Sequence, residues 1–120
     1  MTDDLLSDPS IDTRHLETGR RIAALEGGYS DQPYVVVNDD GSWTCVMTVG
    51  SGHEGQSGQH IIATRSTDQG RTWSDPVAIE PADGPEASWA QPLRVPEIGR
   101  IYVFYTYNAE NRRVLKDEHG

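Results

Sequence analysis

Short runs that alternate apolar and polar positions dominate the chain after residue 28. The β-branched and aromatic run 34–37 precedes Asn38-Asp39-Asp40-Gly41, a sequence typical of a hairpin turn. Alternation then continues in run 42–49, which predicts a strand that faces two environments. The expected strands cover 33–38, 42–49, 59–65, 76–80, 90–95 and 100–107.

Four strands joined by short turns, followed by the same order beginning again, are typical of an all-β propeller of antiparallel four-stranded blades. We predict a polar N-terminal segment over 1–26, a first blade over 27–81 and a partial second blade over 82–120. Residues 20–25 fit a strand or a short helix, and a seventh strand is possible at 113–116. A single β-sandwich remains an alternative, because strand spacing does not separate the two architectures.

Composition narrows the classes of partner. The chain has 10 Lys and Arg against 19 Asp and Glu, a net charge of −9, which disfavours nucleic acid and anionic membranes as partners. The N-terminus lacks a basic region followed by an apolar one, and no apolar run is long enough for a membrane span, so we expect a cytoplasmic protein. A single cysteine, Cys45, excludes an intrachain disulfide, and its apolar surroundings predict a buried, inert thiol.

The segment 66–73, Ser-Thr-Asp-Gln-Gly-Arg-Thr-Trp, is an Asp-box. Asp68 can accept hydrogen bonds from nearby backbone N–H groups, and Ser66 can add another local bond. Gly70 permits a positive φ, and Trp73 can fold its ring back onto the hairpin. Because every part of the motif serves the turn, we expect these four residues to be structural.

With this motif, the region from Tyr29 to Asn108 resembles the sialidase superfamily, whose propellers carry Asp-boxes, also called BNR repeats. The resemblance covers about two thirds of the chain and implies a sialidase-like glycoside hydrolase without a cofactor, acting on a glycan or polysaccharide. Since a propeller has about 4–8 blades, it also implies a fragment whose remaining blades are missing or supplied by other copies.

In family propellers the substrate binds at the end opposite the Asp-boxes, and antiparallel geometry gathers a defined set of loops there. The expected catalytic residues are Asp31, His53 and Glu54. Residues expected to bind substrate offer aromatic rings, amides and hydroxyl-binding groups. They are Tyr29, Gln32, His60, Glu86, Trp89, Tyr105 and Asn108.

Simpler explanations exist for several of these residues. His53 and Glu54 also fit a solvated loop tip, His60 a structural hydrogen bond, and Tyr105 ordinary packing. Asp31 stands where sialidases usually carry an arginine that grips the sialic acid carboxylate, which disfavours sialic acid as substrate. No metal site is expected. The alternatives are a propeller polysaccharide lyase acting on a uronate-containing glycan and a non-catalytic carbohydrate-binding module.

Overall fold

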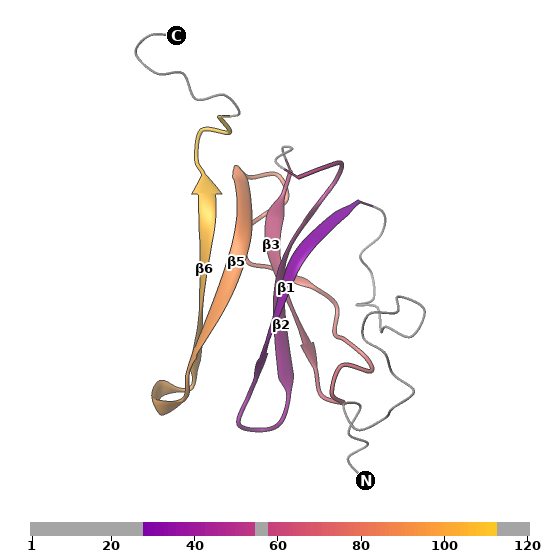
Figure 1. The fold of residues 1–120 in the computed structure, drawn as a ribbon, viewed down its shortest axis with the longest axis vertical. Helices are drawn as coiled ribbons and strands as arrows, with labels where there is room; N and C mark the ends of the chain where they lie inside the picture. The colour runs from indigo at the N-terminus through magenta and orange to yellow at the C-terminus, as the bar shows by residue number, and fades with distance from the viewer. Residues whose placement is uncertain (1–27, 55–57, 113–120) are drawn as a thin grey trace.

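The computed structural model describes residues 28–54 and 58–112, and these residues form an all-β structure of two antiparallel sheets (Figure 1). The first sheet has four strands in the order β1-β2-β3-β4, and the second pairs β5 with β6. A 3₁₀ turn, Pro96–Ile98, joins the last two strands. The strands are β1 (Tyr29–Val37), β2 (Trp43–Gly50), β3 (His60–Ser66), β4 (Val77–Ala78), β5 (Glu86–Val95) and β6 (Arg100–Asn108).

Strand β2 is the centre of the first sheet and is buried on both faces. Its register with β3 runs without interruption from Trp43 opposite Ser66 to Val49 opposite His60. Cys45 faces a cluster with Met47, Val49 and Ile62, and Trp73 packs against that cluster. Burial also raises the pKa of the Cys45 thiol to about 11, so the thiol is protonated and unreactive at neutral pH.

The other face of β2 packs against the second sheet. Val46 and Ile61 from the first sheet meet Ala87 and Ala90 of β5, all of them buried. Small side chains on β5 let the two sheets approach closely, and Tyr105 of β6 covers the margin of this cluster. Apolar burial of this kind is the main favourable term in folding, so the two sheets stabilise one another.

The hairpins β1–β2 and β5–β6 repeat one irregular feature. In each, two residues of the first strand lie opposite one residue of its partner, which is a β-bulge. The first bulged residue has a positive φ in both hairpins: +48° for Gln32 and +58° for Trp89. Non-glycine residues rarely adopt this conformation. The two hairpins are therefore a structural repeat, although their sequences differ.

The Asp-box forms the turn between β3 and β4, and the hydrogen bonds expected from its sequence are present. Asp68 accepts from the Thr72 hydroxyl at 2.6 Å, from the Thr72 N–H at 2.9 Å and from the Ser66 hydroxyl at 2.8 Å. The Gly70 N–H in turn donates to Ser66 Oγ at 2.7 Å, and Trp73 Nε1 donates to the Gly70 carbonyl at 3.2 Å. The motif closes its turn with bonds of its own.

These bonds predict a pH dependence of stability. The Thr72 hydroxyl, the Thr72 N–H and the Ser66 hydroxyl lower the pKa of Asp68 from 3.8 to about 2. A carboxyl group with a lowered pKa in the folded state stabilises the protein above its unfolded pKa, and this contribution is lost as the pH falls toward 2. In urea unfolding, we expect Asp68→Asn to be less stable than the wild type at pH 6, with the difference shrinking between pH 4 and pH 2.

The control for this experiment is Asp83→Asn, since Asp83 is an exposed carboxylate in the loop between β4 and β5. A stability difference between Asp68→Asn and the wild type that stayed constant down to pH 2 would contradict the assignment.

The all-β, antiparallel prediction is confirmed, and so is the burial of Cys45. Several strand limits were wrong: β1 and β5 begin earlier than expected, at Tyr29 and Glu86, and β4 is only Val77–Ala78. The expected N-terminal segment 1–26 and the possible strand 113–116 lie outside the described residues. In the part of the chain that is described, no helix has the length and apolarity needed to cross a membrane.

Candidate functional site

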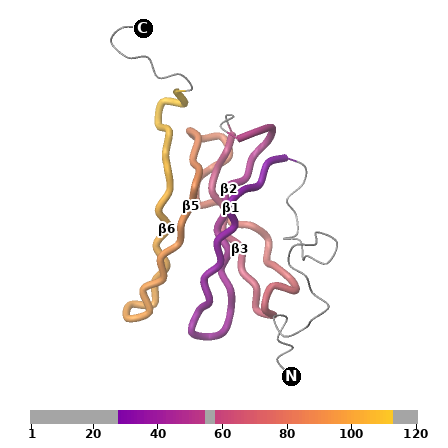
Figure 2. The backbone as a smooth tube through the Cα atoms, in the orientation of Figure 1, coloured from indigo at the N-terminus to yellow at the C-terminus, as the bar shows by residue number. Residues whose placement is uncertain are grey.

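The loops of the two hairpins divide between two ends of the structure. The β1–β2 turn and the β5–β6 turn lie at the lower end in Figure 1 and Figure 2. At the upper end lie the start of β1 and the ends of β2 and β6, with Tyr29 opposite Gly50 and Glu86 opposite Asn108. Because β3 pairs antiparallel with β2, the Asp-box that follows β3 is at the lower end. We call the upper end, where the predicted site residues fall, the loop end.

The clearest chemical feature of the loop end is a hydrogen-bonded pair on β1. The Tyr29 hydroxyl donates to Asp31 Oδ2 at 2.8 Å, and the Gln32 N–H donates to Asp31 Oδ1 at 2.8 Å. Residues two apart on a strand share a face, which brings the phenol and the carboxylate together. Each carboxylate oxygen thus has a donor, and the side chain is held in one orientation.

This arrangement sets the protonation of Tyr29. The hydrogen bond to Asp31, partial burial, and the negative charges of Asp31 and Glu54 raise its pKa to about 12. Tyr29 is therefore a neutral phenol near pH 7, able to donate a hydrogen bond and poorly suited to act as a base. The structure thus brings together Tyr29 and Asp31, two residues that the sequence predicted for the site, and the charge of Glu54 makes the smallest contribution to the raised pKa of Tyr29.

The bulges fix the backbone beside this pair. In β1 the N–H of Gln32 bonds to the preceding aspartate, whereas in β5 the N–H of Trp89 donates to Thr48 Oγ1 at 3.0 Å. This second bond joins the two sheets. Trp89 is 52 % exposed as a residue, so it can offer a stacking surface at the loop end. Residues with a rare backbone φ are frequent at functional sites, and so are β-bulges. The two bulges are therefore consistent with a functional site at this end.

The two histidines are tied to the backbone of the loop that precedes β3. Nδ1 of His60 lies 3.1 Å from the Gly58 carbonyl, a contact that orients the ring. His53 is exposed, and its carbonyl accepts from Nε2 of the buried Gln59 at 2.9 Å. The carbonyl of Gln59 in turn accepts from the Ala87 N–H at 3.0 Å. Gln59 thereby connects this loop to the start of β5.

The remaining predicted residues fall in a second group on the β5–β6 hairpin. Asn108 Nδ2 lies 3.4 Å from Glu86 Oε2, a long hydrogen bond. The Tyr105 hydroxyl donates to Glu80 Oε1 at 2.5 Å, and this bond raises the pKa of Tyr105. Tyr105 is half-buried against the core between the sheets. Its hydrogen bond to Glu80 therefore serves mainly to join the second sheet to the first. Tyr107, two residues later on β6, is exposed.

Thr48 and Glu80 also belong to this end, and the sequence analysis did not select them. Thr48 is a buried polar residue in an otherwise apolar strand, and Glu80 follows the short strand β4. A polar side chain within an apolar strand, such as that of Thr48, could have been recognised from the sequence, because a buried hydroxyl group needs a hydrogen-bond partner. Nothing in the sequence around Glu80 indicates that Tyr105 would be its partner.

Within residues 28–54 and 58–112, no group of three or more His, Cys, Asp or Glu side chains is placed to hold a metal ion. The chemistry available at the loop end is that of carboxylates, phenols, amides, two imidazoles and one exposed indole.

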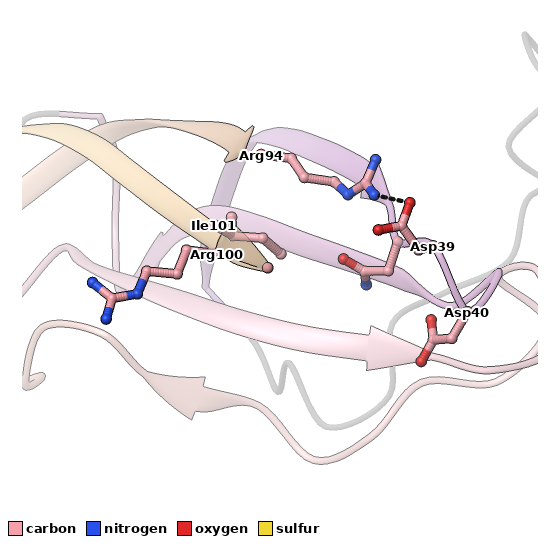
Figure 3. A pocket seen from close by; sticks show the side chains of 7 residues that line it. Asp39, Asp40, Arg94, Arg100 and Ile101 are labelled. Atoms are coloured by element: carbon pink, nitrogen blue, oxygen red, sulfur yellow. Dashed lines mark hydrogen bonds and ion pairs between the residues drawn. The ribbon is translucent and has the colours of Figure 1, made fainter. Parts of the chain in front are cut away.

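A groove of about 370 Å³ lies at the lower end, between the turns of the two hairpins (Figure 3). An ion pair between Arg94 of β5 and Asp39 of the β1–β2 turn spans it. The opposite charges satisfy each other, so we interpret the groove as a contact between turns; none of the predicted site residues lines it.

A scan against protein-family models, a search of curated proteins and a search of solved structures each found no match.

Proposed function

We propose that this chain belongs to a sialidase-like β-propeller and contributes to a glycoside hydrolase site at its loop end. The observation that carries the proposal is the Tyr29–Asp31 pair, with Glu54 on the β2–β3 loop and Trp89 exposed at the same end. The repeated bulged hairpin and the self-closed Asp-box turn support the propeller architecture.

The proposed roles follow from the contacts. Asp31, held by two donors, acts as the carboxylate that attacks the sugar or activates water, while Glu54 on the Gly-rich loop protonates the leaving group. Tyr29 donates a hydrogen bond to Asp31 and steadies it. Trp89 offers an apolar platform for a sugar ring. Further blades, missing from this chain or supplied by other copies, complete the site.

The acidic character of this end favours a neutral glycan. Asp31, Glu54 and Glu86 would repel the carboxylate of a sialic or uronic acid. A lyase also needs a base to abstract a proton beside a carboxylate, and the raised pKa of Tyr29 makes that phenol unsuitable. The alternatives to a hydrolase are a lyase and a non-catalytic carbohydrate-binding module, and the assay below distinguishes the three.

A panel of fluorogenic neutral glycosides tests the proposal. We expect turnover by the wild type only when the remaining blades are supplied, and under that condition a loss of roughly 100- to 10,000-fold in Asp31→Asn, the range for removing a catalytic acid or base. The matched control is Asp75→Asn, an exposed aspartate just beyond the Asp-box, which should keep wild-type activity. Near-ultraviolet absorbance from an unsaturated sugar would indicate a lyase instead, and glycan binding without turnover would indicate a binding module.

A further inference from the structure

Thr48 places a polar side chain in the apolar interior between the two sheets. It is 1 % exposed and lies two residues from Val46 on β2, so it shares the face that packs against Ala87 and Ala90 of β5. Burying a hydroxyl group among apolar side chains is costly unless the group is hydrogen-bonded. Valine has nearly the same shape and would fill this position without that cost, so the hydroxyl group itself calls for a reason.

The hydroxyl group of Thr48 bonds to the bulge of the second hairpin. Thr48 Oγ1 accepts from the Trp89 N–H at 3.0 Å. Trp89 lies within the bulge, between the ladder positions of Ser88 and Gln91, and has a φ of +58°. A non-glycine residue keeps such a conformation only where its surroundings impose it. The bond from Thr48 therefore fixes the backbone that carries the exposed indole.

Thr48 is also the cross-strand neighbour of Asp31. The two residues lie opposite each other in the register of β1 with β2, and directly opposite Cα atoms of an antiparallel pair are about 4.5–5.5 Å apart. In the first hairpin the N–H of the equivalent bulge residue, Gln32, bonds within its own strand to Asp31 Oδ1. The N–H of Trp89 reaches across to the other sheet instead. Thr48 is thus beside Asp31 in the first sheet and bonded to Trp89 in the second.

We propose that Thr48 is a positioning residue of the loop-end site, whose hydroxyl group sets the place of Trp89 relative to Asp31. The inference rests on the proposed function, in which Trp89 carries the sugar ring on which Asp31 acts. Catalysis requires these two groups at a fixed separation, because reacting atoms have to be held close and aligned. Apolar packing between the sheets is non-directional, whereas a hydrogen bond prescribes both distance and angle.

Fluorine NMR of the complete chain labelled with 5-fluorotryptophan tests the position of Trp89 without any glycan. The chain has 3 tryptophans, and the resonance that disappears in Trp89→Phe belongs to Trp89. We expect Thr48→Val, which removes the hydroxyl group and keeps the shape, to shift that resonance. Thr48→Ser keeps the hydroxyl group and should restore the wild-type position. An unshifted resonance in Thr48→Val, or a failure of Thr48→Ser to restore it, would overturn the proposal.

The matched control is Thr64→Val. Thr64 is 3 % exposed and its hydroxyl group donates to the Ser74 carbonyl at 2.7 Å, so this variant also loses the bond of a buried threonine, but beside the Asp-box. It should leave the Trp89 resonance in place. Equal shifts in Thr48→Val and Thr64→Val would indicate a general loosening of the fold and rule out a specific role for Thr48.

Hydrogen exchange in the wild type gives a result that does not depend on whether a variant folds. Although Trp89 is exposed as a residue, its N–H should exchange slowly with deuterated solvent, because it is bonded to a buried hydroxyl group. Exchange at the rate of an unbonded amide would contradict the proposal.

Turnover separates this inference from the proposed function. With the remaining blades supplied, Thr48→Val should lower kcat by about 100-fold, as expected when a bound group is misplaced by about 1 Å, and Thr48→Ser should recover most of the loss. Wild-type turnover in Thr48→Val would overturn the positioning role and leave the hydrolase intact. If the wild type hydrolyses no glycoside, the proposed function fails, whereas the fluorine and exchange measurements still decide whether Thr48 sets the place of Trp89.

Discussion

We expect Ile61→Ala to lower the free energy of unfolding by about 2–5 kcal/mol, the usual cost of truncating a fully buried isoleucine. Ile61 is 0 % exposed and lies where the first sheet meets Ala87 and Ala90 of the second. Those partners are small and on a bulged strand, so they have little side chain with which to fill the cavity. The measurement is urea unfolding followed by circular dichroism.

The effect should reach beyond local stability. The Ile61 side chain belongs to the apolar cluster between the two sheets, whereas its backbone carbonyl, which accepts from the N–H groups of Ile79 and Glu80, is kept in the variant. We therefore expect the variant to expose the faces of the two sheets and to bind a hydrophobic dye. Val77→Ala, at an exposed position on β4, should cost less than about 0.5 kcal/mol, as is usual for surface substitutions. Equal losses in the two variants would show that the sheets do not share a core.

Strands were predicted correctly from the sequence where apolar residues alternate with polar ones and the apolar residues face the core. Strand β2 shows the limit of that inference: alternation indicated two environments, and the structure shows that both are apolar interiors. One of those interiors exists only because β5 returns to cover Val46. Such a contact joins residues far apart in the chain, and the local pattern does not encode it.

The early starts of β1 and β5 have a common cause. The expected first strand began at Pro33, a residue that lacks a backbone N–H and so cannot donate to a strand ladder. In the structure Pro33 sits inside the bulge, where no ladder bond is needed, and the strand continues back to Tyr29. Strand β5 extends through its own bulge in the same way.

The candidate site was predicted in part for the same reason. Tyr29 and Asp31 were selected as neighbours of the first strand, but their hydrogen bond follows only once both belong to β1 and share a face. The link between Tyr105 and Glu80 was not predicted, because it depends on how the second sheet lies against the first. Sequence reasoning located the loop end, and tertiary packing decided which of its side chains meet.

Gly70→Ala should be the second severe change, with an expected loss of about 2–5 kcal/mol in urea unfolding. Two costs add: Gly70 has a φ of +85°, which costs other residues about 1–2 kcal/mol. An added Cβ would also lie 3.0 Å from Cζ3 of Trp43, and overpacking of this kind costs about 1–3 kcal/mol. The near-ultraviolet circular dichroism of the tryptophans should change with it, since the Trp43 ring must move.

Gly41→Ala separates the two costs, because Gly41 has a similar φ of +78° but no atom within 4 Å of an added Cβ. It should lose only the conformational part, about 1–2 kcal/mol, and leave the tryptophan signal unchanged. If the two variants were equally stable, Gly70 would serve the turn through its φ alone and the contact with Trp43 would be immaterial. A larger loss in Gly70→Ala would instead mean that the Asp-box holds the hairpin by packing its glycine beneath a tryptophan of β2, as well as by its hydrogen bonds.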